Sequence, residues 1–440
     1  MILIKNGYMI DPSTGREGYY DLLTDGDKIV SIGTELTAPS EECSVIDAKG
    51  LVVAPGLVDV HVHFRDPGFP DKEDIGTGAA AAAKGGFTTV VLMANTKPAV
   101  DNSQTLAYVL EKGAKTGIHV ETCANVTVGM GGDTLTDMEG LAAKGAVGFT
   151  DDGIPLMNEE LVREAMRQSA VLGMPISFHE EDARLITNNG VNAGKASAFY
   201  GIGGSPREAE ISLVERDLQL ALETGACMNV QHISAKESVE LVRRAKAKVN
   251  ETACSHRETH CQSTVMADIH AEATPHHFVL TEDAVIKYGT LAKMNPPLRE
   301  EADRLAIIEG LKDGTIDIIA TDHAPHTAQE KAKPITEAPS GITGLETSLA
   351  LGITYLVNPG HITMCKLLQL MSTNPAKMYH LNAGALAEGG PADIILIDKE
   401  TEWTVEKFAS KATNTPFTEW RLCGKVVKTI CKGEEVYAAK

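Results

Sequence analysis

Short apolar runs alternate with longer amphipathic stretches about every 30 residues through the middle of the chain. The amphipathic stretches carry apolar residues at i, i+3 and i+4 and a glycine near their ends, which is typical of helices. Repeated strand–helix units of this kind predict a (β/α)8 TIM barrel, in which catalytic residues gather at the carboxyl ends of the strands. The eight predicted strands are Val58–His63, Thr88–Met93, His119–Ala124, Ala146–Thr150, Pro175–His179, Met228–His232, Ile269–Thr274 and Ile316–Thr321.

Both ends of the chain have a different pattern, in which apolar and polar residues alternate between turn signals such as Asp25-Gly26 and Lys49-Gly50. This pattern is typical of antiparallel strands with one buried face. We therefore predict a composite β domain from residues 1–55 and 385–440, beside a metal-dependent barrel over residues 56–384. The alternation alone does not prove that the two ends pair.

Histidine, aspartate or asparagine stands at the end of most predicted barrel strands. The first strand ends in His61-Val62-His63. Residues i and i+2 of a strand point to the same face, so the two imidazoles project together, and Arg65 lies one further step along that face. Two core histidines would explain this motif alone, but they would not explain the other strand ends. These carry Asn95, Asp151, Asp152, His179, His232, Asn295 and Asp322.

Several imidazoles and carboxylates around an open position suit Zn²⁺. The predicted ligands exceed what one tetrahedral zinc needs, so we expect two ions, which would make a water nucleophilic near neutral pH. Asp322 would also take the proton of that water and return it to a leaving nitrogen. Such a site hydrolyses, or in reverse forms, an amide-like C–N bond. The ligand set is His61, His63, Asp152, His179, His232 and Asp322.

The composition excludes some partners. With 60 acidic and 40 basic residues, the net charge is −20, whereas nucleic acid and anionic membranes need a basic surface. The chain shows neither a signal peptide nor an apolar run of membrane length. Its eight cysteines are scattered without a framework spacing, as expected for reduced thiols. We expect a cytoplasmic enzyme with a small-molecule substrate.

At this point the motifs resemble the amidohydrolase superfamily and, within it, the dihydroorotases. The resemblance spans the chain through HVHFRDPG, NTKPAVDN, FTDDG, ATPHH, KMNPPLR, ATDHAPHTAQEK, SGITGLE and GGPADIILID. HFRDPG and KMNPPLR are specific signals, whereas GGPADIILID marks only the wider superfamily.

This resemblance implies reversible hydrolysis of the cyclic amide of (S)-dihydroorotate to N-carbamoyl-L-aspartate, the third step of pyrimidine biosynthesis. It implies Zn²⁺, two ions per chain, a homodimer, and a loop from His323 to Gly344 over the site. Association with aspartate transcarbamoylase is left open. The implied substrate-binding residues are His63, Arg65, Asn95, Asn295, His326, Ser340 and Gly341.

Two features depart from the family pattern. Many relatives bridge their metals with a carbamylated lysine at the end of the fourth strand, where this chain has FTDDG. The chain resembles the bacterial type that uses aspartate, and the 27-residue step to His179 favours Asp152 over Asp151 as the bridge. The second feature is an insertion at residues 249–267 that contains Cys254, His256, His260 and Cys261. We interpret it as a surface or contact segment on the face opposite the active site, with a second metal site as the alternative.

Two other functions stay open from the sequence. A hydantoinase, dihydropyrimidinase or allantoinase would act on rings without a carboxylate, against which the cation of Arg65 discriminates. A barrel that serves only as a scaffold for a partner enzyme would be expected to have lost ligands, and here every candidate ligand is present.

Overall fold

The computed structural model describes the backbone of residues 1–259 and 266–439 and the side chains of residues 1–251 and 266–439. The metal-binding alternative for Cys254, His256, His260 and Cys261 therefore lies outside the described side chains.

The eight predicted barrel strands are present, and all pair in parallel. They form a sheet in the order β6-β7-β8 and a second in the order β13-β12-β11-β10-β9. Parallel bridges between Ala124 and Phe149 and between Val62 and His323 join the two sheets into a closed barrel. The strands are β6 (Leu57–Val62), β7 (Phe87–Leu92), β8 (His119–Thr122), β9 (Phe149–Thr150), β10 (Ile176–Phe178), β11 (Cys227–Val230), β12 (Asp268–Ala273) and β13 (Ile318–Ile319).

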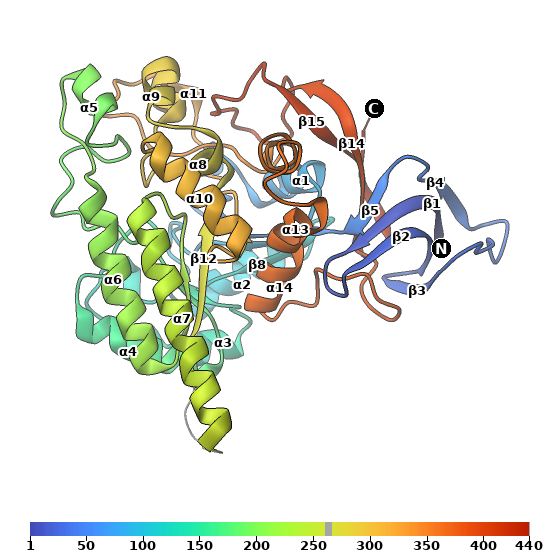
Figure 1. Cartoon of the computed structure of the whole chain (residues 1–440), viewed down its shortest axis with the longest axis horizontal. Helices are drawn as coiled ribbons and strands as arrows, with labels where there is room; N and C mark the ends of the chain where they lie inside the picture. The colour runs from blue at the N-terminus through green and yellow to red at the C-terminus, as the bar shows by residue number, and fades with distance from the viewer. Residues whose placement is uncertain (260–265, 440) are drawn as a thin grey trace.

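Helices cover the outside of the barrel (Figure 1), and their ends carry the expected caps. Asn158 accepts a hydrogen bond from the backbone of Leu161 at the start of α4, and Gly173 ends that helix at φ 65°. The long helices are α1 (Ile75–Gly85), α2 (Ser103–Gly113), α4 (Glu159–Leu172), α6 (Arg207–Thr224), α7 (Lys236–Thr259) and α10 (Glu301–Asp313).

Shorter helices fill the loops and follow the last strand. They are α3 (Met138–Ala143), α5 (Lys195–Tyr200), α8 (Pro275–Val279), α9 (Asp283–Tyr288), α11 (Ala328–Lys331), α12 (Ser348–Gly352), α13 (Met364–Leu368) and α14 (Asn374–Met378). Single 3-10 or π turns occupy η1 (Val128–Met130), η2 (Gly289–Ala292), η3 (Ile353–Val357) and η4 (Gln369–Thr373).

Strands from both ends of the chain form one eight-stranded sheet beside the barrel (Figure 1). The junction is an antiparallel pair of β5 and β14, in which Ile394 lies opposite Pro55. The sheet order is β16-β15-β14-β5-β1-β2-β3, with β4 paired to β1. Its strands are β1 (Ile2–Asp11), β2 (Arg16–Asp25), β3 (Lys28–Gly33), β4 (Ser44–Asp47), β5 (Val52–Pro55), β14 (Ile394–Thr404), β15 (Arg421–Cys431) and β16 (Glu434–Ala438). The predicted fold class, a barrel with a β-rich unit from both ends, is confirmed.

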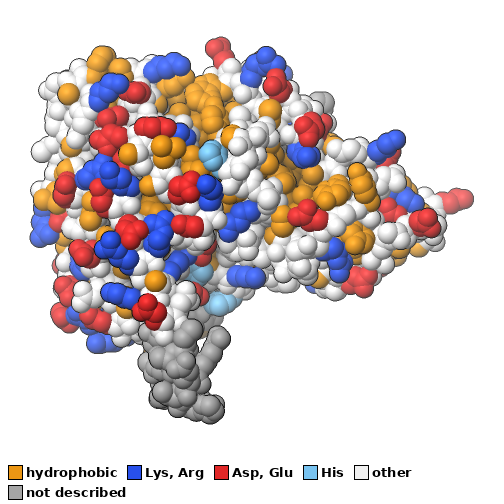
Figure 2. All heavy atoms as spheres, in the orientation of Figure 1, with side chains coloured by type: hydrophobic (Ala, Val, Ile, Leu, Met, Phe, Trp, Pro, Cys, Tyr) orange, Lys and Arg blue, Asp and Glu red, His pale blue; other side chains and the backbone are white. Residues whose placement is uncertain are grey.

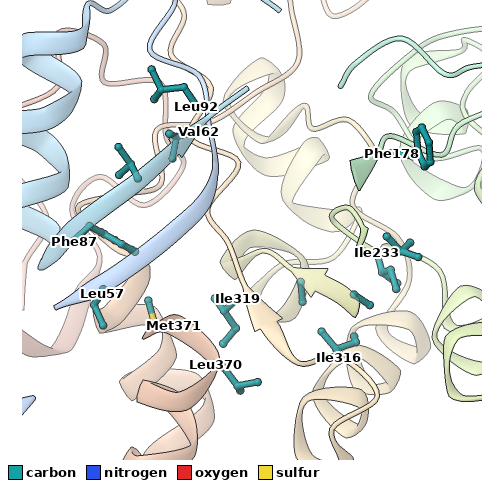
Figure 3. Packing of buried hydrophobic residues seen from close by; sticks show 14 of the residues in the cluster. Leu57, Val62, Phe87, Leu92, Phe178, Ile233, Ile316, Ile319, Leu370 and Met371 are labelled. Atoms are coloured by element: carbon teal, nitrogen blue, oxygen red, sulfur yellow. The ribbon is translucent and has the colours of Figure 1, made fainter. Parts of the chain in front are cut away.

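The largest apolar cluster lies between the barrel strands and the helices. It includes Leu57, Phe87 and Ile319 from three strands and continues into the segment after β13 through Leu370 and Met371 (Figure 3). Burial of this apolar surface is the main force that holds the strand ends in place. Acidic and basic side chains are interspersed on the face in Figure 2. Among the described residues, no helix is both long and apolar enough to span a membrane.

Candidate metal and active site

The six predicted ligands converge at the carboxyl ends of the barrel strands. His61 is in β6, His179 directly follows β10, and the others lie within three residues of a strand end. His232 (φ 31°) and Asp322 (φ 46°) have backbone conformations that are costly for residues other than glycine. Such strain is concentrated at functional sites, where the surrounding structure holds it.

Asp152 lies in the middle of the cluster. Its Oδ1 is 3.4 Å from Nε2 of His61, 3.8 Å from Nε2 of His232 and 3.9 Å from Nδ1 of His179. Its Oδ2 is 3.4 Å from Nε2 of His63. The carboxylate of Asp152 therefore has His61, His179 and His232 on the side of Oδ1 and His63 on the side of Oδ2.

The neighbouring Asp151 has a different role. Its carboxylate accepts hydrogen bonds from the backbone of Val126 at 2.9 Å and Thr127 at 3.1 Å, and from Nδ2 of Asn125 at 3.1 Å. The Thr127 hydroxyl donates a further hydrogen bond. These contacts hold the loop after β8, so the structure places Asp152 in the cluster and Asp151 outside it.

Asp322 lies beside the two histidines of the first barrel strand and its end, His61 and His63. Its Oδ1 accepts a hydrogen bond from Nε2 of His63 at 3.0 Å and lies 3.6 Å from Nε2 of His61. Burial would raise the pKa of Asp322, but the His63 hydrogen bond and the nearby histidine charges hold that pKa well below its usual range. The carboxyl group is therefore ionised at neutral pH.

Sequence reasoning missed a buried carboxylate beneath the cluster. Oε1 of Glu272, in β12, lies 2.5 Å from Nδ1 of His61 and accepts a hydrogen bond from the backbone of His232. Asn229 donates to the other oxygen at 3.1 Å. A carboxylate behind a ligating imidazole fixes its tautomer and leaves Nε2 free toward a metal. Glu181 is a second buried carboxylate behind the cluster, with Oε2 3.4 Å from Nε2 of His179.

The residues fit a metal ion. Nε2 of His61 is fully buried and has no hydrogen-bond partner, although two carboxylate oxygens lie within 3.6 Å. Burial would lower the pKa of His61, yet Glu272 and Asp152 raise it well above its usual value, so the surroundings favour positive charge. Donor atoms of two sets, His61/Asp152/His232 and His61/His63/Asp322, lie within 4.8 Å of one another. A buried polar atom without a partner is costly, and a cation here would remove that cost.

A cavity of about 260 Å³ opens above the cluster. All seven predicted substrate-binding residues line it: His63, Arg65, Asn95, Asn295, His326, Ser340 and Gly341. Sequence reasoning missed Gly153, Asn189 and Ala324. Asn95 hydrogen-bonds Asp152 at 3.2 Å, and Asn295 donates to Nε2 of His179 at 3.1 Å. The amides are thus held against the cluster.

Arg65 lines the cavity from a loop, whereas the strand pattern predicted a position on the strand face. The strand β6 is irregular between Asp59 and Val62 and ends at Val62, so Arg65 does not lie on the strand face. It stands in the following loop at φ 60°. Its guanidinium lies 3.4 Å from Nε2 of His326 and 3.4 Å from the carbonyl of Pro325. The expectation of a strand position was wrong, but the predicted location beside the cluster was right.

Solved structures of similar fold include a hydantoinase and a dihydropyrimidinase. The L-hydantoinase of Arthrobacter aurescens matches with a TM-score of 0.86 at 24% identity, over 99% of this chain and 96% of its own. The dihydropyrimidinase of Brevibacillus agri NCHU1002 matches with a TM-score of 0.84 at 23% identity, over 99% and 95%. At these identities the likeness shows the fold. The barrel with a buried histidine–aspartate cluster at its carboxyl end is the arrangement of a metal-dependent enzyme.

Sequence comparison identifies the family. The dihydroorotase of Clostridioides difficile (strain 630) is 54% identical over 439 residues and that of Lactococcus lactis subsp. lactis (strain IL1403) 49% identical over 440, each covering 100% of both chains. The Dihydro-orotase-like family model matches residues 50–238. The chain belongs to the dihydroorotase family.

Proposed function

We propose that this site catalyses the reversible hydrolysis of (S)-dihydroorotate to N-carbamoyl-L-aspartate. The observation that carries the proposal is a guanidinium, that of Arg65, in the same cavity as a buried cluster suited to metal. Dihydroorotate has a carboxylate beside its scissile ring amide, and an arginine pairs with a carboxylate through two parallel hydrogen bonds.

Two Zn²⁺ ions per chain would be held by the cluster. The residues that would hold them are His61, His63, Asp152, His179, His232 and Asp322. Imidazole nitrogens and carboxylate oxygens are the donors that zinc prefers. Zinc, when bound, supplies Lewis acidity and makes attack by water feasible near neutral pH.

Asp322 would transfer the proton between the attacking water and the leaving nitrogen. The ionised carboxylate of Asp322 accepts the proton of the attacking water and returns it to the ring nitrogen as the C–N bond breaks. In the reverse direction the same carboxylate takes the proton from the attacking carbamoyl nitrogen. Oδ1 of Asn95 accepts a hydrogen bond from Nδ1 of His63 at 3.0 Å, which leaves Nε2 of His63 free toward the metal.

The cavity residues orient the ring. Arg65 pairs with the substrate carboxylate, while the amides of Asn95 and Asn295 offer neutral hydrogen bonds. Burial and the charge of Arg65 lower the pKa of His326 to about 2, so its imidazole is neutral and adds no second charge. Ser340 and Gly341 also line this cavity, and their backbone would contact the substrate.

A comparison of substrates tests the proposal. Wild-type protein should hydrolyse dihydroorotate far faster than neutral dihydrouracil or hydantoin. Replacing Arg65 by Met should remove about 2–5 kcal/mol of binding to the charged substrate, much of it from the unpaired carboxylate. Arg65→Lys should restore only part, because an ammonium cannot form the bidentate pair. Zinc content should stay unchanged in both variants. Equal or faster turnover of dihydrouracil by the wild type would instead favour a dihydropyrimidinase.

We also propose that the enzyme works in the cytoplasm. The six cysteines that lie in the described part of the chain are free thiols, and free thiols are typical of a reducing compartment.

A further inference from the structure

A second group of metal-type donors lies at the opposite mouth of the barrel. Cys227 and Asp268 are the first residues of β11 and β12, and they lie directly opposite each other in the parallel pairing. His270 follows Asp268 by two residues. Because alternate residues of a strand share a face, Asp268 and His270 point to the same side as Cys227. The intervening Ile269 and Ala271 belong to the large apolar cluster instead.

This face continues upward to the active site. Two residues beyond Cys227 is Asn229, and two residues beyond His270 is Glu272, the carboxylate beneath His61. At about 3.3 Å per residue, Asp268 lies about 13 Å below Glu272 along the strand. The two groups of donors therefore occupy opposite ends of one strand and share no ligand.

His270 is oriented as a metal ligand would be. Its Nδ1 lies 2.8 Å from Oδ2 of Asp317. Asp317 is itself held by the backbone of Ala271 at 3.1 Å and by Lys246 at 3.2 Å. A carboxylate that accepts a hydrogen bond from the Nδ1–H of a histidine leaves Nε2 with a free lone pair. This is the arrangement found behind zinc-bound histidines.

The free nitrogen points into the group of donors. Nε2 of His270 is buried and forms no hydrogen bond, although Oδ2 of Asp268 is only 3.2 Å away. Nε2, the Cys227 thiol and the Asp268 carboxylate all lie within 4.8 Å of one another. Short distances without hydrogen-bond alignment are expected where an ion stands between the donors. The Asp268 side chain is 69% exposed, so an ion has access from solvent.

We propose that Cys227, Asp268 and His270 bind a Zn²⁺ ion that is separate from the catalytic centre. Thiolate, imidazole and carboxylate together match the preferences of zinc better than those of Mg²⁺ or Ca²⁺, which take oxygen ligands. Binding releases the thiol proton of Cys227 to solvent, because the thiolate is the ligand. The ion would tie the first residues of β11 to those of β12, whose register the backbone pairing already sets.

Cobalt substitution tests the site, because Co²⁺ bound to a thiolate has a charge-transfer band in the near ultraviolet. The candidate catalytic ligands are imidazoles and carboxylates, so the band reports a thiolate ligand outside the catalytic centre. Full-length protein produced with Co²⁺ should show the band, and Cys227→Ser should abolish it. The control Cys365→Ser, which changes another half-buried cysteine, should keep it.

Metal analysis gives an independent measure that does not depend on the spectrum. Folded Cys227→Ser and His270→Gln should each contain one zinc equivalent less than the wild type, with kcat/KM unchanged. Asp268→Asn, at an exposed position, should fold normally and bind Co²⁺ at least tenfold more weakly at this site.

The proposal is overturned if the cobalt-loaded wild type shows no thiolate band. In that case His270 is an ion-paired histidine between Asp268 and Asp317. A band that survives Cys227→Ser also overturns it, because the thiolate then comes from another cysteine.

Discussion

At the scale of single residues, the two neighbours Asp151 and Asp152 have opposite surroundings. Four donor groups hold the carboxylate of Asp151 in the protein framework, whereas Asp152 faces four histidines. Of the two, only Asp152 lies among the histidines that would hold the proposed ions.

Replacing Asp152 by Ala should lower the zinc content by at least one equivalent and reduce activity by orders of magnitude, because it removes the oxygens between the histidines. Metal analysis and initial rates with dihydroorotate measure both effects. The matched variant Asp151→Asn should retain metal and lose mainly stability. Full metal and activity in Asp152→Ala would show that Asp152 is not the bridge.

Asp322→Asn keeps the shape of the side chain but removes the proton-accepting oxygen. Turnover should fall by about 10²–10⁴, while calorimetry should still detect substrate binding. If the variant turns over at nearly the wild-type rate, the acid/base role belongs to another group, and His326 is the nearest candidate.

The sequence predicted the residues at strand ends better than those that support them. His61, His179 and Asp322 could be predicted because the carboxyl ends of parallel strands meet at one edge. Glu272 is an acidic residue inside a buried strand, and its role depends on a contact with His61 that is 211 positions away. The position of Arg65 depends on where β6 ends, which the alternation of residues does not specify.

At the scale of elements, two buried lysines hold the segment that carries Ser340 and Gly341. Nζ of Lys331 donates to the carbonyls of Pro339 and Gly341, each at 3.0 Å. Nζ of Lys293 donates to the carbonyls of Ile335 and Ala338, each at 2.7 Å. The loop predicted over the site is thus held from below by two lysine amino groups.

Lys331→Met should destabilise the protein by about 1–3 kcal/mol, because two buried carbonyls lose their hydrogen-bond donor. It should also raise KM for dihydroorotate, since Ser340 and Gly341 line the cavity. Urea unfolding and steady-state kinetics measure these effects. The control Lys333→Met, at an exposed position of the same loop, should change neither.

The pH dependence of stability gives a second test of Lys331. Burial and the charge of Lys293 lower the pKa of Lys331 to about 7, against 10.5 in the unfolded chain. Between these values the unfolded chain binds the proton more tightly, so this contribution to stability is complete above pH 10.5 and is lost as pH falls toward 7. The stability of the wild type relative to Lys331→Met should therefore rise from pH 7 to pH 9. A difference that does not change with pH would contradict the lowered pKa.

Helical periodicity and buried runs were enough to predict the barrel elements. Each predicted strand overlaps an observed one, because hydrophobic spacing depends only on nearby residues. The π turns η3 and η4 continue the helices before them with the same apolar spacing. That spacing does not distinguish them from ordinary helix, so the sequence did not reveal them.

At the scale of the whole molecule, the barrel and the eight-stranded sheet meet at Gly56, between β5 and β6. A Cβ atom at this position would lie only 2.0 Å from Oγ1 of Thr88. The close approach lets the Gly56 backbone pass beside β7 and accept a hydrogen bond from Ser372 at 2.6 Å.

Gly56→Ala should destabilise the protein by about 1–3 kcal/mol through overpacking. The control Gly33→Ala, where the nearest atom to an added Cβ is a flexible leucine methyl at 3.4 Å, should change stability by less than about 0.5 kcal/mol. Thermal unfolding of the two variants provides the comparison. Equal stability of Gly56→Ala and the wild type would show that Thr88 can move aside.

The pairing of the chain ends could be predicted only as a hypothesis. Alternating residues identify β5 and β14 as strands, but no local signal specifies that Pro55 lies opposite Ile394. That contact follows from barrel closure, which brings distant segments to one edge.

Because β5 pairs with β14, this part of the sheet can form only after nearly the whole chain has been synthesised. A ribosome that has made β5 must add about 340 further residues before the first residue of β14 exists. At about 5–20 residues per second, this takes tens of seconds. During that time Val52–Pro55, an apolar strand, has an open edge of the kind that invites pairing with other chains. This edge of β5 therefore stays unpaired with β14 until the last strands of the chain have been made.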